Sequence, residues 1–345
     1  MTKIFFLLSG EHETLPVAEL KAILEAEGHV YQVLDKLDQV VRIETVLDCV
    51  EAVKHRAALT RLCCFELFNC KAETDEIVKV MRSTSLNEVL KVGESFAVRV
   101  KRVKEASARI GRMALERKLG ELILGMAEDT KVNLVNPEKT FIGILTGERF
   151  VFGSKLAEIQ PKPFVERSPR KKPFFHPSAM PAKLARCMVN LAEPKTEELV
   201  FDPFCGTGGM LIEAAFTGCR VLGLDAQSRM VKGSQCNLAY FNIEPEGLVV
   251  GDARNMPLTR FDCVVTDPPY GRSATTLKRT TTQIIEEFLV AVHGILDKGR
   301  RVCMAAPKSV GVSRIGESLK YKHLQSHFVY VHRSLTREIA VLKKV

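Results

Sequence analysis

The segment Asp267-Pro268-Pro269-Tyr270 combines residue types that can handle an amino group on a planar ring. It follows a short apolar run that is typical of a buried strand. Two successive prolines fix an extended turn and offer no backbone N–H. The Asp267 carboxylate and the Pro268 carbonyl are therefore left to accept the two hydrogens of one NH2 group. Because the Tyr270 ring can stack on an extruded base, the pattern predicts chemistry at an exocyclic base nitrogen.

Upstream, a glycine-rich turn runs from Asp202 through Phe204, Gly206 and Gly208. Glycine at such a turn permits positive φ and a close approach of a ligand. The turn lacks the GxGxxG spacing of a dinucleotide site and the GK[ST] ending of a P-loop. Nucleotide triphosphate binding is therefore not expected, and the turn predicts a different cofactor.

Two more acidic residues lie at the ends of predicted strands, Asp225 after residues 221–224 and Asp252 after residues 248–250. In an open α/β sheet, ligands bind outside the carboxyl ends of the strands. Asp225 is placed to accept hydrogen bonds from ribose hydroxyls, and Asp252 with Ala253 is placed to contact an adenine amino group. The series predicts an adenosine-containing cofactor beside the target base.

The elements that position these residues alternate along the second half of the chain. Strands are expected at residues 199–201, 221–224, 248–250, 263–266 and 301–305, and helices from residue 209, at 230–241 and at 283–296. This alternation predicts an α/β fold with a mostly parallel, Rossmann-like sheet and helices on both faces. The runs 328–331 and 339–342 have no helix between them and predict a C-terminal antiparallel hairpin.

The N-terminal part predicts two smaller α+β domains, at residues 1–60 and 61–155. Residues 1–60 are expected to alternate strand, helix, strands and helix, with a helix over residues 15–27. In the second domain, strands are expected at 95–102, 132–137 and 140–145, with a helix at 107–126. Residues 156–175, rich in proline and basic side chains, predict an extended linker without a regular helix. The C-terminal domain is then residues 176–345.

Basic residues concentrate in the second of these domains and predict a surface for phosphate contacts. The proposed RNA-binding residues are Arg99, Lys101, Arg102, Arg109 and Arg112. The whole chain has a formal net charge of +9, which favours a nucleic-acid partner.

Ten cysteines occur without a CxxC pair, so we expect buried thiols and no metal site. No apolar run approaches the ~20 residues of a membrane span. The N-terminus shows no signal-peptide pattern, and a cytoplasmic protein is expected.

Together these motifs resemble a known family over essentially the whole chain. Residues 176–345 resemble class I S-adenosylmethionine-dependent methyltransferases of the Asp-Pro-Pro-Tyr type. Residues 61–155 resemble a THUMP RNA-binding domain, preceded by a ferredoxin-like domain. With the run from His176 to Pro181 and the segment Gly271-Arg272-Ser273-Ala274-Thr275-Thr276, the chain resembles the archaeal tRNA guanine-10 N2-methyltransferases.

The resemblance implies S-adenosylmethionine as cofactor and the N2 amino group of a tRNA guanosine as acceptor, mono- or dimethylated. It implies that residues 176–180, beginning with His176, close over the methionine part of the cofactor. Asp202, Phe204, Gly206 and Gly208 would form the cofactor turn, Asp225 would hold the ribose, and Asp252 and Ala253 the adenine. Asp267 and Tyr270 would hold the target base. The THUMP domain would grip the tRNA acceptor end, and some relatives also need a small activator subunit.

Three alternatives stay open from the sequence. Relatives act at another tRNA guanine or on ribosomal RNA. The Asp-Pro-Pro-Tyr turn also serves N6-adenine and N4-cytosine DNA methyltransferases, although the N-terminal domains look like an RNA module. The third alternative is a non-catalytic RNA-binding protein with a degenerate methyltransferase fold. The presence of all four acidic residues, Asp202, Asp225, Asp252 and Asp267, argues against it. Cys205 is not expected to be a nucleophile, because amino methylation needs no covalent base adduct.

Overall fold

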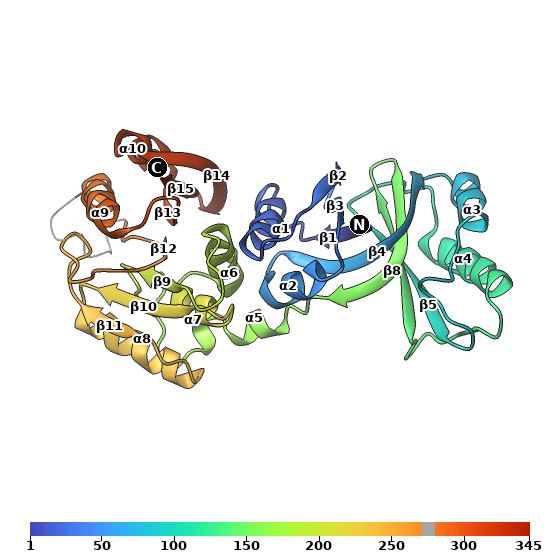
Figure 1. Cartoon of the computed structure of the whole chain (residues 1–345), viewed down its shortest axis with the longest axis horizontal. Helices are drawn as coiled ribbons and strands as arrows, with labels where there is room; N and C mark the ends of the chain where they lie inside the picture. Colours follow the sequence, from blue (N-terminus) through green and yellow to red (C-terminus); the bar gives the residue numbers. More distant parts are fainter. Residues whose placement is uncertain (271–279) are drawn as a thin grey trace. The chain divides into compact units, whose positions relative to one another are not determined.

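The computed structural model describes residues 1–270 and 280–345, so the predicted segment from Gly271 to Thr276 lies outside the described residues. The chain forms two compact units (Figure 1). The first unit comprises residues 1–11, 29–54 and 60–159, and the second comprises residues 12–28, 55–59 and 160–345. Within the described ranges, no helix has both the length and the apolar character needed to span a bilayer.

The first unit is built on one eight-stranded sheet with the order β2-β3-β1-β4-β8-β7-β5-β6. Its strands are β1 (Thr2–Leu8), β2 (Gln32–Leu37), β3 (Val40–Thr45), β4 (Thr60–Lys71), β5 (Ser95–Arg102), β6 (Lys131–Val132), β7 (Lys139–Thr146) and β8 (Arg149–Glu158). Because β1 pairs with β4, the boundary predicted at residue 60 falls inside a continuous sheet. The domain limits and names given above stay predictions.

Helices α3 (Thr74–Arg82) and α4 (Arg112–Met126) pack on the β5–β7–β8 part of this sheet. The apolar residues Ile77 and Met81 of α3 are four apart, and therefore face the same way and enter one core. That core contains stacked phenylalanine rings, with Phe141 and Phe152 5.8 Å apart between centroids. Helix α2 (Cys49–Arg56) begins in the first unit, and its last two residues belong to the second unit.

Two elements of the first unit are shorter than predicted. The helix expected from residue 107 starts at Arg112, and Lys104 and Ser107 before it have positive φ, which a right-handed helix does not allow. The strand expected over residues 132–137 is only β6, because the Asn133 side chain accepts from the amides of Val135 and Asn136 and closes a turn.

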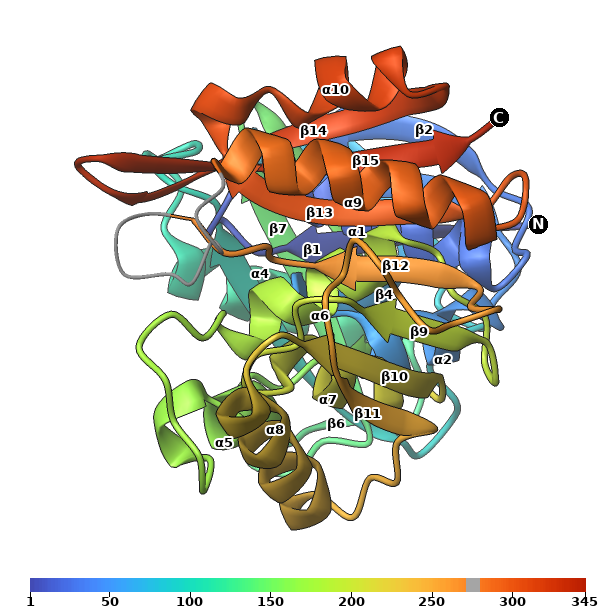
Figure 2. The same cartoon turned by 90° about the vertical axis from the view of Figure 1, so that its left-hand side faces the viewer.

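The second unit contains a seven-stranded sheet with the order β11-β10-β9-β12-β13-β15-β14 (Figure 2). Its strands are β9 (Leu199–Asp202), β10 (Arg220–Asp225), β11 (Gly247–Val250), β12 (Cys263–Thr266), β13 (Arg301–Pro307), β14 (Tyr321–His332) and β15 (Leu335–Lys344). The strands β9 to β13 are parallel to one another, and β15 is antiparallel to β13 and β14, so the predicted sheet and hairpin are confirmed. Strand order reverses between β9 and β12, which is where such a sheet binds its ligand.

Helices cover both faces of this sheet. One core includes α1 (Leu15–Ala26), α6 (Ala182–Leu191), α7 (Gly209–Ala215) and α8 (Ser228–Tyr240). The other includes α9 (Thr281–Ile295) and α10 (Val312–Ser318), which follows η2 (Lys308–Val310) (Figure 2). The alternating strands and helices predicted from residue 199 onward are thus confirmed, with ends shifted by a few residues.

The linker prediction was wrong about local structure. Residues 156–175 contain the helix α5 (Lys162–Glu166) and the 3-10 turn η1 (Pro169–Lys171). Their prolines sit at the first positions of each element, where no amide hydrogen bond is required. The segment is also packed, because Arg167 is buried against Glu213.

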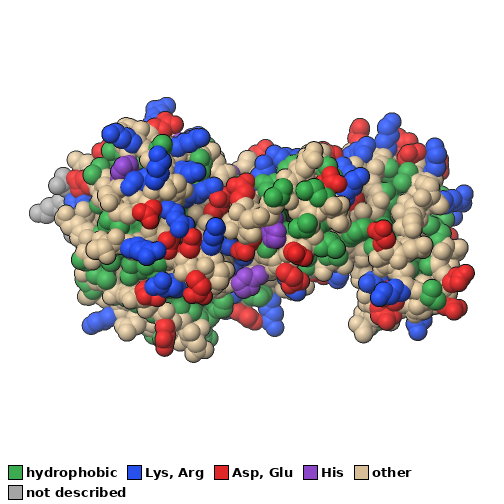
Figure 3. Space-filling view, viewed as in Figure 1, with side chains coloured by type: hydrophobic (Ala, Val, Ile, Leu, Met, Phe, Trp, Pro, Cys, Tyr) green, Lys and Arg blue, Asp and Glu red, His purple; other side chains and the backbone are tan. Residues whose placement is uncertain are grey.

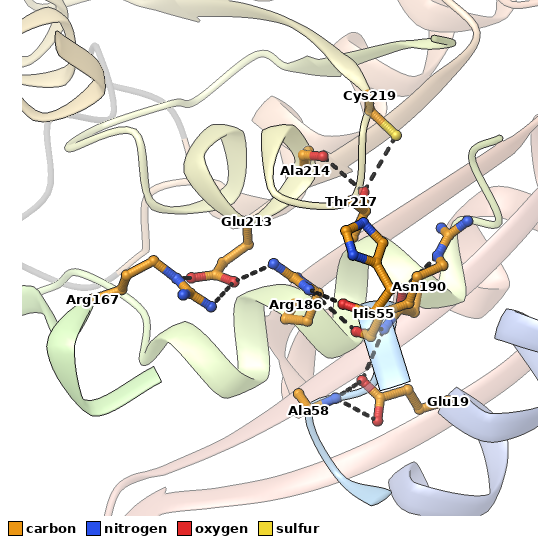
Figure 4. A network of polar contacts seen from close by, with 11 residues as sticks. Glu19, His55, Ala58, Arg167, Arg186, Asn190, Glu213, Ala214, Thr217 and Cys219 are labelled. Carbon is orange, nitrogen blue, oxygen red and sulfur yellow. Dashed lines mark hydrogen bonds and ion pairs between the residues drawn. The ribbon is translucent and has the colours of Figure 1, made fainter. Parts of the chain in front are cut away.

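Helix α1 and residues 55–59 belong to the second unit through a buried polar network (Figure 4). The Glu19 carboxylate accepts hydrogen bonds from the amides of Ala58 and Leu59 and from the Asn190 side chain. Burial raises the pKa of Glu19, and these hydrogen bonds oppose the rise. The same network includes Glu213, whose two oxygens bind Arg167, with Arg186 on one of them.

Candidate active site

Four acidic residues meet at the carboxyl edge of the second sheet. Asp202 is the last residue of β9 and Asp225 the last of β10, while Asp267 follows β12 and Asp252 comes two residues after β11. The two central strands are linked at this edge, because the Thr266 hydroxyl donates to Asp202 Oδ1 over 2.7 Å. The structure thus brings the predicted site residues of the C-terminal domain to one edge.

The glycine-rich turn between β9 and α7 is held to this edge by backbone amides. Gly206 and Gly208 have φ of +50° and +77°, and a Cβ at Gly208 would lie 2.5 Å from the Ser234 hydroxyl. The amide of Phe204 donates to Asp202 Oδ1. Asp202 is only 2% exposed, and burial raises its pKa to about 7. The turn therefore requires glycine both for its backbone angles and for space.

Asp225 has the geometry expected of a ribose acceptor. Its Oδ2 accepts from the Gly206 amide over 3.0 Å and its Oδ1 from the Gln227 amide over 2.9 Å. Each oxygen keeps a second lone pair, and the side chain is only partly buried. Burial raises the pKa of Asp225, and the nearby His176 opposes the rise. The His176 ring is itself held by the Ser178 hydroxyl, 2.7 Å from Nδ1.

Asp252 has a partner that the sequence did not predict. Arg254 binds both its oxygens through Nε and Nη2 and reaches Glu287 with Nη1. This pairing lowers the pKa of Asp252. The neighbouring Ala253 is buried in the core on the α9 side. Any group that bound Asp252 would thus share it with Arg254.

The Asp267-Pro268-Pro269-Tyr270 turn lies beside this edge and contacts one residue that sequence reasoning missed. Arg337, from β15, donates through Nε to the Tyr270 hydroxyl over 2.6 Å. Its Nη2 lies 3.5 Å from Asp267 Oδ2. Pro268, which follows Asp267 in the sequence, is buried. The only hint in the sequence is a charged pair, Arg337-Glu338, directly before the apolar run of a buried strand.

Asp267 has one oxygen without a partner. Its Oδ1 is buried and accepts no hydrogen bond from any described residue. Burial raises the pKa of Asp267 to about 6, while Arg337 and a hydrogen bond from Tyr270 oppose the rise. Since an unpaired buried acceptor is costly, such an atom in a native fold points to a donor that arrives with a ligand.

Nine of the ten cysteines are buried, as expected, whereas Cys236 is exposed. Cys205, in the glycine-rich turn, is buried, and burial raises the pKa of its thiol well above the ordinary range. A thiol in this state is a poor nucleophile. Among the described residues, no three His, Cys, Asp or Glu side chains gather as a metal site requires.

The predicted RNA-binding residues fall into two groups. Arg99 donates to the carbonyls of Val98 and Leu134, and Arg102 donates to those of Ser107 and Ile110. The other three, Lys101, Arg109 and Arg112, are exposed. The view in Figure 3 shows basic and acidic side chains interspersed around α3 and α4, where α3 contributes Asp75 and Glu76.

Comparison with known families finds two matching models. One, described as an RMKL-like methyltransferase domain, matches residues 169–339, which include all four acids of the strand edge. The other, described as a DNA methylase, matches residues 86–235 and ends before Asp267.

Similar proteins match along nearly the full chain. The tRNA (guanine(10)-N2)-dimethyltransferase of Methanothermobacter thermautotrophicus is 35% identical, over 99% of this chain and 100% of the relative. The protein of the same name from Pyrococcus abyssi is 30% identical, over 94% and 95%. Among solved structures, TrmN from Thermus thermophilus has a TM-score of 0.56 at 19% identity, covering 99% of this chain and all of that one. That likeness concerns the fold alone.

Proposed function

Because the chain belongs to the family of tRNA (guanine(10)-N2)-dimethyltransferases, we propose that it methylates N2 of guanine 10 in tRNA, with S-adenosylmethionine as methyl donor. The observation that carries this proposal is the buried, unpartnered Oδ1 of Asp267 at the strand edge. An exocyclic amine is the donor that fits an ionised acceptor there.

The chemistry follows from the position of that oxygen. When bound, S-adenosylmethionine would supply an electrophilic methyl group, whose bond to sulfur breaks in the transfer with the electron pair staying on the sulfur. Asp267 Oδ1 accepts one hydrogen of the guanine N2 amine, and the Pro268 carbonyl accepts the other. The amine lone pair, otherwise delocalised into the ring, is thereby directed out of the ring plane. Once the N–C bond forms the nitrogen must lose a proton, and Asp267 is the base in contact with it. Tyr270 stacks on the guanine.

The rest of the strand edge fits the cofactor. Asp225 would bind the ribose hydroxyls through its free lone pairs, and Asp252 with Ala253 would contact the adenine. The Asp202–Gly208 turn would approach the methionine part, which residues 176–180, starting at His176, would cover. The fit is supported by the positive φ of Gly206 and Gly208 and by the missing Cβ at Gly208.

The first unit would bind the tRNA. We assign residues 61–155 as a THUMP domain and propose the exposed Lys101, Arg109 and Arg112 as its phosphate contacts. Arg99 and Arg102, which are tied to carbonyls, would support this surface. A small activator subunit and a cytoplasmic location complete the proposal. Co-purification from the native cell tests the first, and cell fractionation tests the second.

The decisive experiment is mass spectrometry of unmodified tRNA incubated with the protein and isotope-labelled S-adenosylmethionine. We expect label on N2 of guanine 10, first as a monomethyl and then as a dimethyl product, in keeping with the name of the relatives. A tRNA with adenine at that position is the matched control and should stay unlabelled. Label at another guanine of the tRNA, or label that appears only when ribosomal RNA or DNA is supplied instead of tRNA, would replace the proposed substrate. Absence of labelling together with RNA binding would favour a non-catalytic role.

A further inference from the structure

Arg337 is the one described cation that contacts both ends of the Asp267–Tyr270 turn. It lies on β15 opposite Pro307 of β13, and its side chain is nearly buried. Besides donating to the Tyr270 hydroxyl, its guanidinium carbon lies 5.6 Å from the centre of the Tyr270 ring. Its contact with Asp267 is longer, 3.5 Å from Nη2 to Oδ2, and Oδ1 accepts no hydrogen bond from it.

This geometry differs from that of an arginine that merely neutralises a buried carboxylate. A guanidinium usually binds such a group with two parallel hydrogen bonds. Arg167 does so with Glu213, over 2.7 and 3.1 Å. Arg337 instead uses its Nε for Tyr270 and leaves Asp267 Oδ1 without a partner. In this arrangement Oδ2 of the carboxylate has a partner, and Oδ1 is left to accept a hydrogen bond from a ligand.

We propose that Arg337 is a positioning residue of the methyl transfer, which keeps Asp267 ionised and fixes the Tyr270 hydroxyl so that Oδ1 is presented to the substrate amine. This inference rests on the proposed function. Guanine and Arg337 can bind Asp267 at the same time, because they use different oxygens. Arg337 would therefore stay in place during turnover.

The charged groups around Asp267 show how the role of Arg337 can be measured, through the pKa of Asp267. The groups that face it are Arg337 from β15, Tyr270 from its own turn and Asp202 from β9. Of these, only Arg337 carries a positive charge. Burial already raises the pKa of Asp267 to about 6, so loss of Arg337 would raise it further. A protonated Asp267 cannot accept a proton from the amine, and activity at neutral pH should fall.

The test is the pH dependence of kcat on tRNA for the wild type, Arg337→Gln and Arg337→Lys. In Arg337→Gln the acid limb should move up by about one pH unit, which lowers kcat about fivefold at pH 6, about tenfold well below pH 6 and hardly at all at pH 9. KM for both substrates should change less than about twofold, because neither binds through Arg337 in this scheme. Arg337→Lys should keep the acid limb near that of the wild type, with a lower plateau because Tyr270 loses its partner.

Arg300→Gln is the matched control. Arg300 also pairs with two carboxylates, Glu198 and Asp262, but at the amino ends of β9 and β12. Its removal should leave the pH profile unchanged. A loss of kcat in Arg337→Gln that is equal at every pH would overturn the positioning role and leave a structural one.

A measurement without tRNA separates this inference from the proposed function. Titration of 13C-labelled aspartate carboxyls by NMR, with Asp267 assigned by its absence in Asp267→Asn, should show a higher Asp267 pKa in Arg337→Gln than in the wild type. An unchanged pKa would refute the role of Arg337. If the wild type instead fails to methylate tRNA, the proposed function fails, and the NMR result still decides whether Arg337 holds Asp267 ionised.

Discussion

Glu213 and Asp267 are both shielded carboxylates of the second unit that lie beside arginine, yet their surroundings differ in one respect. Glu213 is saturated, because Arg167 binds both of its oxygens and Arg186 adds a further contact. Asp267 has an arginine on Oδ2 and no partner on Oδ1. The first arrangement fits a structural role, since both oxygens are buried and already bound by arginine. The second leaves one acceptor open, as a binding site requires.

Proton binding is affected by burial at both places. In the structural network burial raises the pKa of Glu19, and three donors, the amides of Ala58 and Leu59 and the Asn190 side chain, oppose the rise. At the strand edge, burial raises the pKa of Asp202 to about 7 and that of Asp267 to about 6. The active site therefore holds charge that costs folding free energy, and variants at the two places should respond in opposite ways.

The largest effect is expected from Asp267→Asn. Methyl transfer should fall by about 100- to 1,000-fold, as when a single group that contacts the transition state is lost. Folding should become more stable at pH 8, by up to about 3 kcal/mol, because the raised native pKa means that ionised Asp267 is disfavoured in the folded state. This gain should be absent below about pH 4, the ordinary pKa of aspartate, grow as the pH rises to about 6, and stay constant above that value.

Single-turnover methylation and urea unfolding at pH 4 and pH 8 measure both effects of Asp267→Asn. Cofactor affinity, measured by calorimetry, should be retained. Substantial residual turnover, or equal destabilisation at the two pH values, would contradict the assignment.

Glu213→Gln should act on stability instead. Arg167 and Arg186 would lose a buried anion, which typically costs about 3 kcal/mol or more. Urea unfolding of the second unit measures the loss, and activity per folded molecule should stay close to that of the wild type. The control is Glu246→Gln, which breaks an exposed pair with Arg220 on the same unit and should change little. A loss of activity without a loss of stability would place Glu213 among the catalytic residues.

Asp225→Asn should weaken S-adenosylmethionine binding by about tenfold, through loss of a charge-assisted acceptor. The NH2 group of the asparagine side chain would also face the backbone N–H of Gly206 or Gln227. Both N–H groups now donate hydrogen bonds to the carboxylate. Calorimetric titration of the cofactor tests this, with the exposed Asp297→Asn as control. If the dissociation constant did not change, the ribose contact would have to lie elsewhere.

The smallest effect is expected in the first unit. Replacing Lys101, Arg109 and Arg112 by glutamine should weaken tRNA binding and lower the slope of log affinity against log salt by about 2. Glutamine at the exposed Lys3, Lys54 and Lys71 removes the same charge from the same unit and should alter the slope less. Equal slopes for the two triple variants would argue against an RNA surface at residues 101–112.

The sequence predicted what depends on local signals. The strand–helix alternation from residue 199 onward and the acids at the strand ends follow from short apolar runs and turn residues. Arg337 was missed because it is 67 residues from Tyr270, and only the antiparallel return of β15 beside β13 brings it to the turn. The pairing of Asp252 with Arg254 was also missed, although it is local, because sequence alone does not show which acceptor a flexible arginine selects.

Contacts between distant segments account for the remaining differences. Proline density predicted an extended linker, whereas the prolines begin α5 and η1 and let Arg167 pack on α7. Helix α1 was predicted with its first residue correct and its end one residue late, and it was assigned to the N-terminal domain. Its apolar face packs in the core with α6. That choice depends on Glu19 meeting Asn190, which are 171 residues apart.

The inclusion of α1 in the second unit has a consequence for protein synthesis. On the ribosome, α1 is synthesised long before the strands of the sheet against which it packs. Until those strands are made, the apolar side chains of Leu15 and Ala22 stay exposed to solvent. Domains usually fold in the order in which they are translated. Here the second unit needs both the beginning and the end of the chain, and a fragment starting at residue 160 would lack part of its core. Nascent chains of this protein are therefore expected to need chaperone protection until translation is nearly complete.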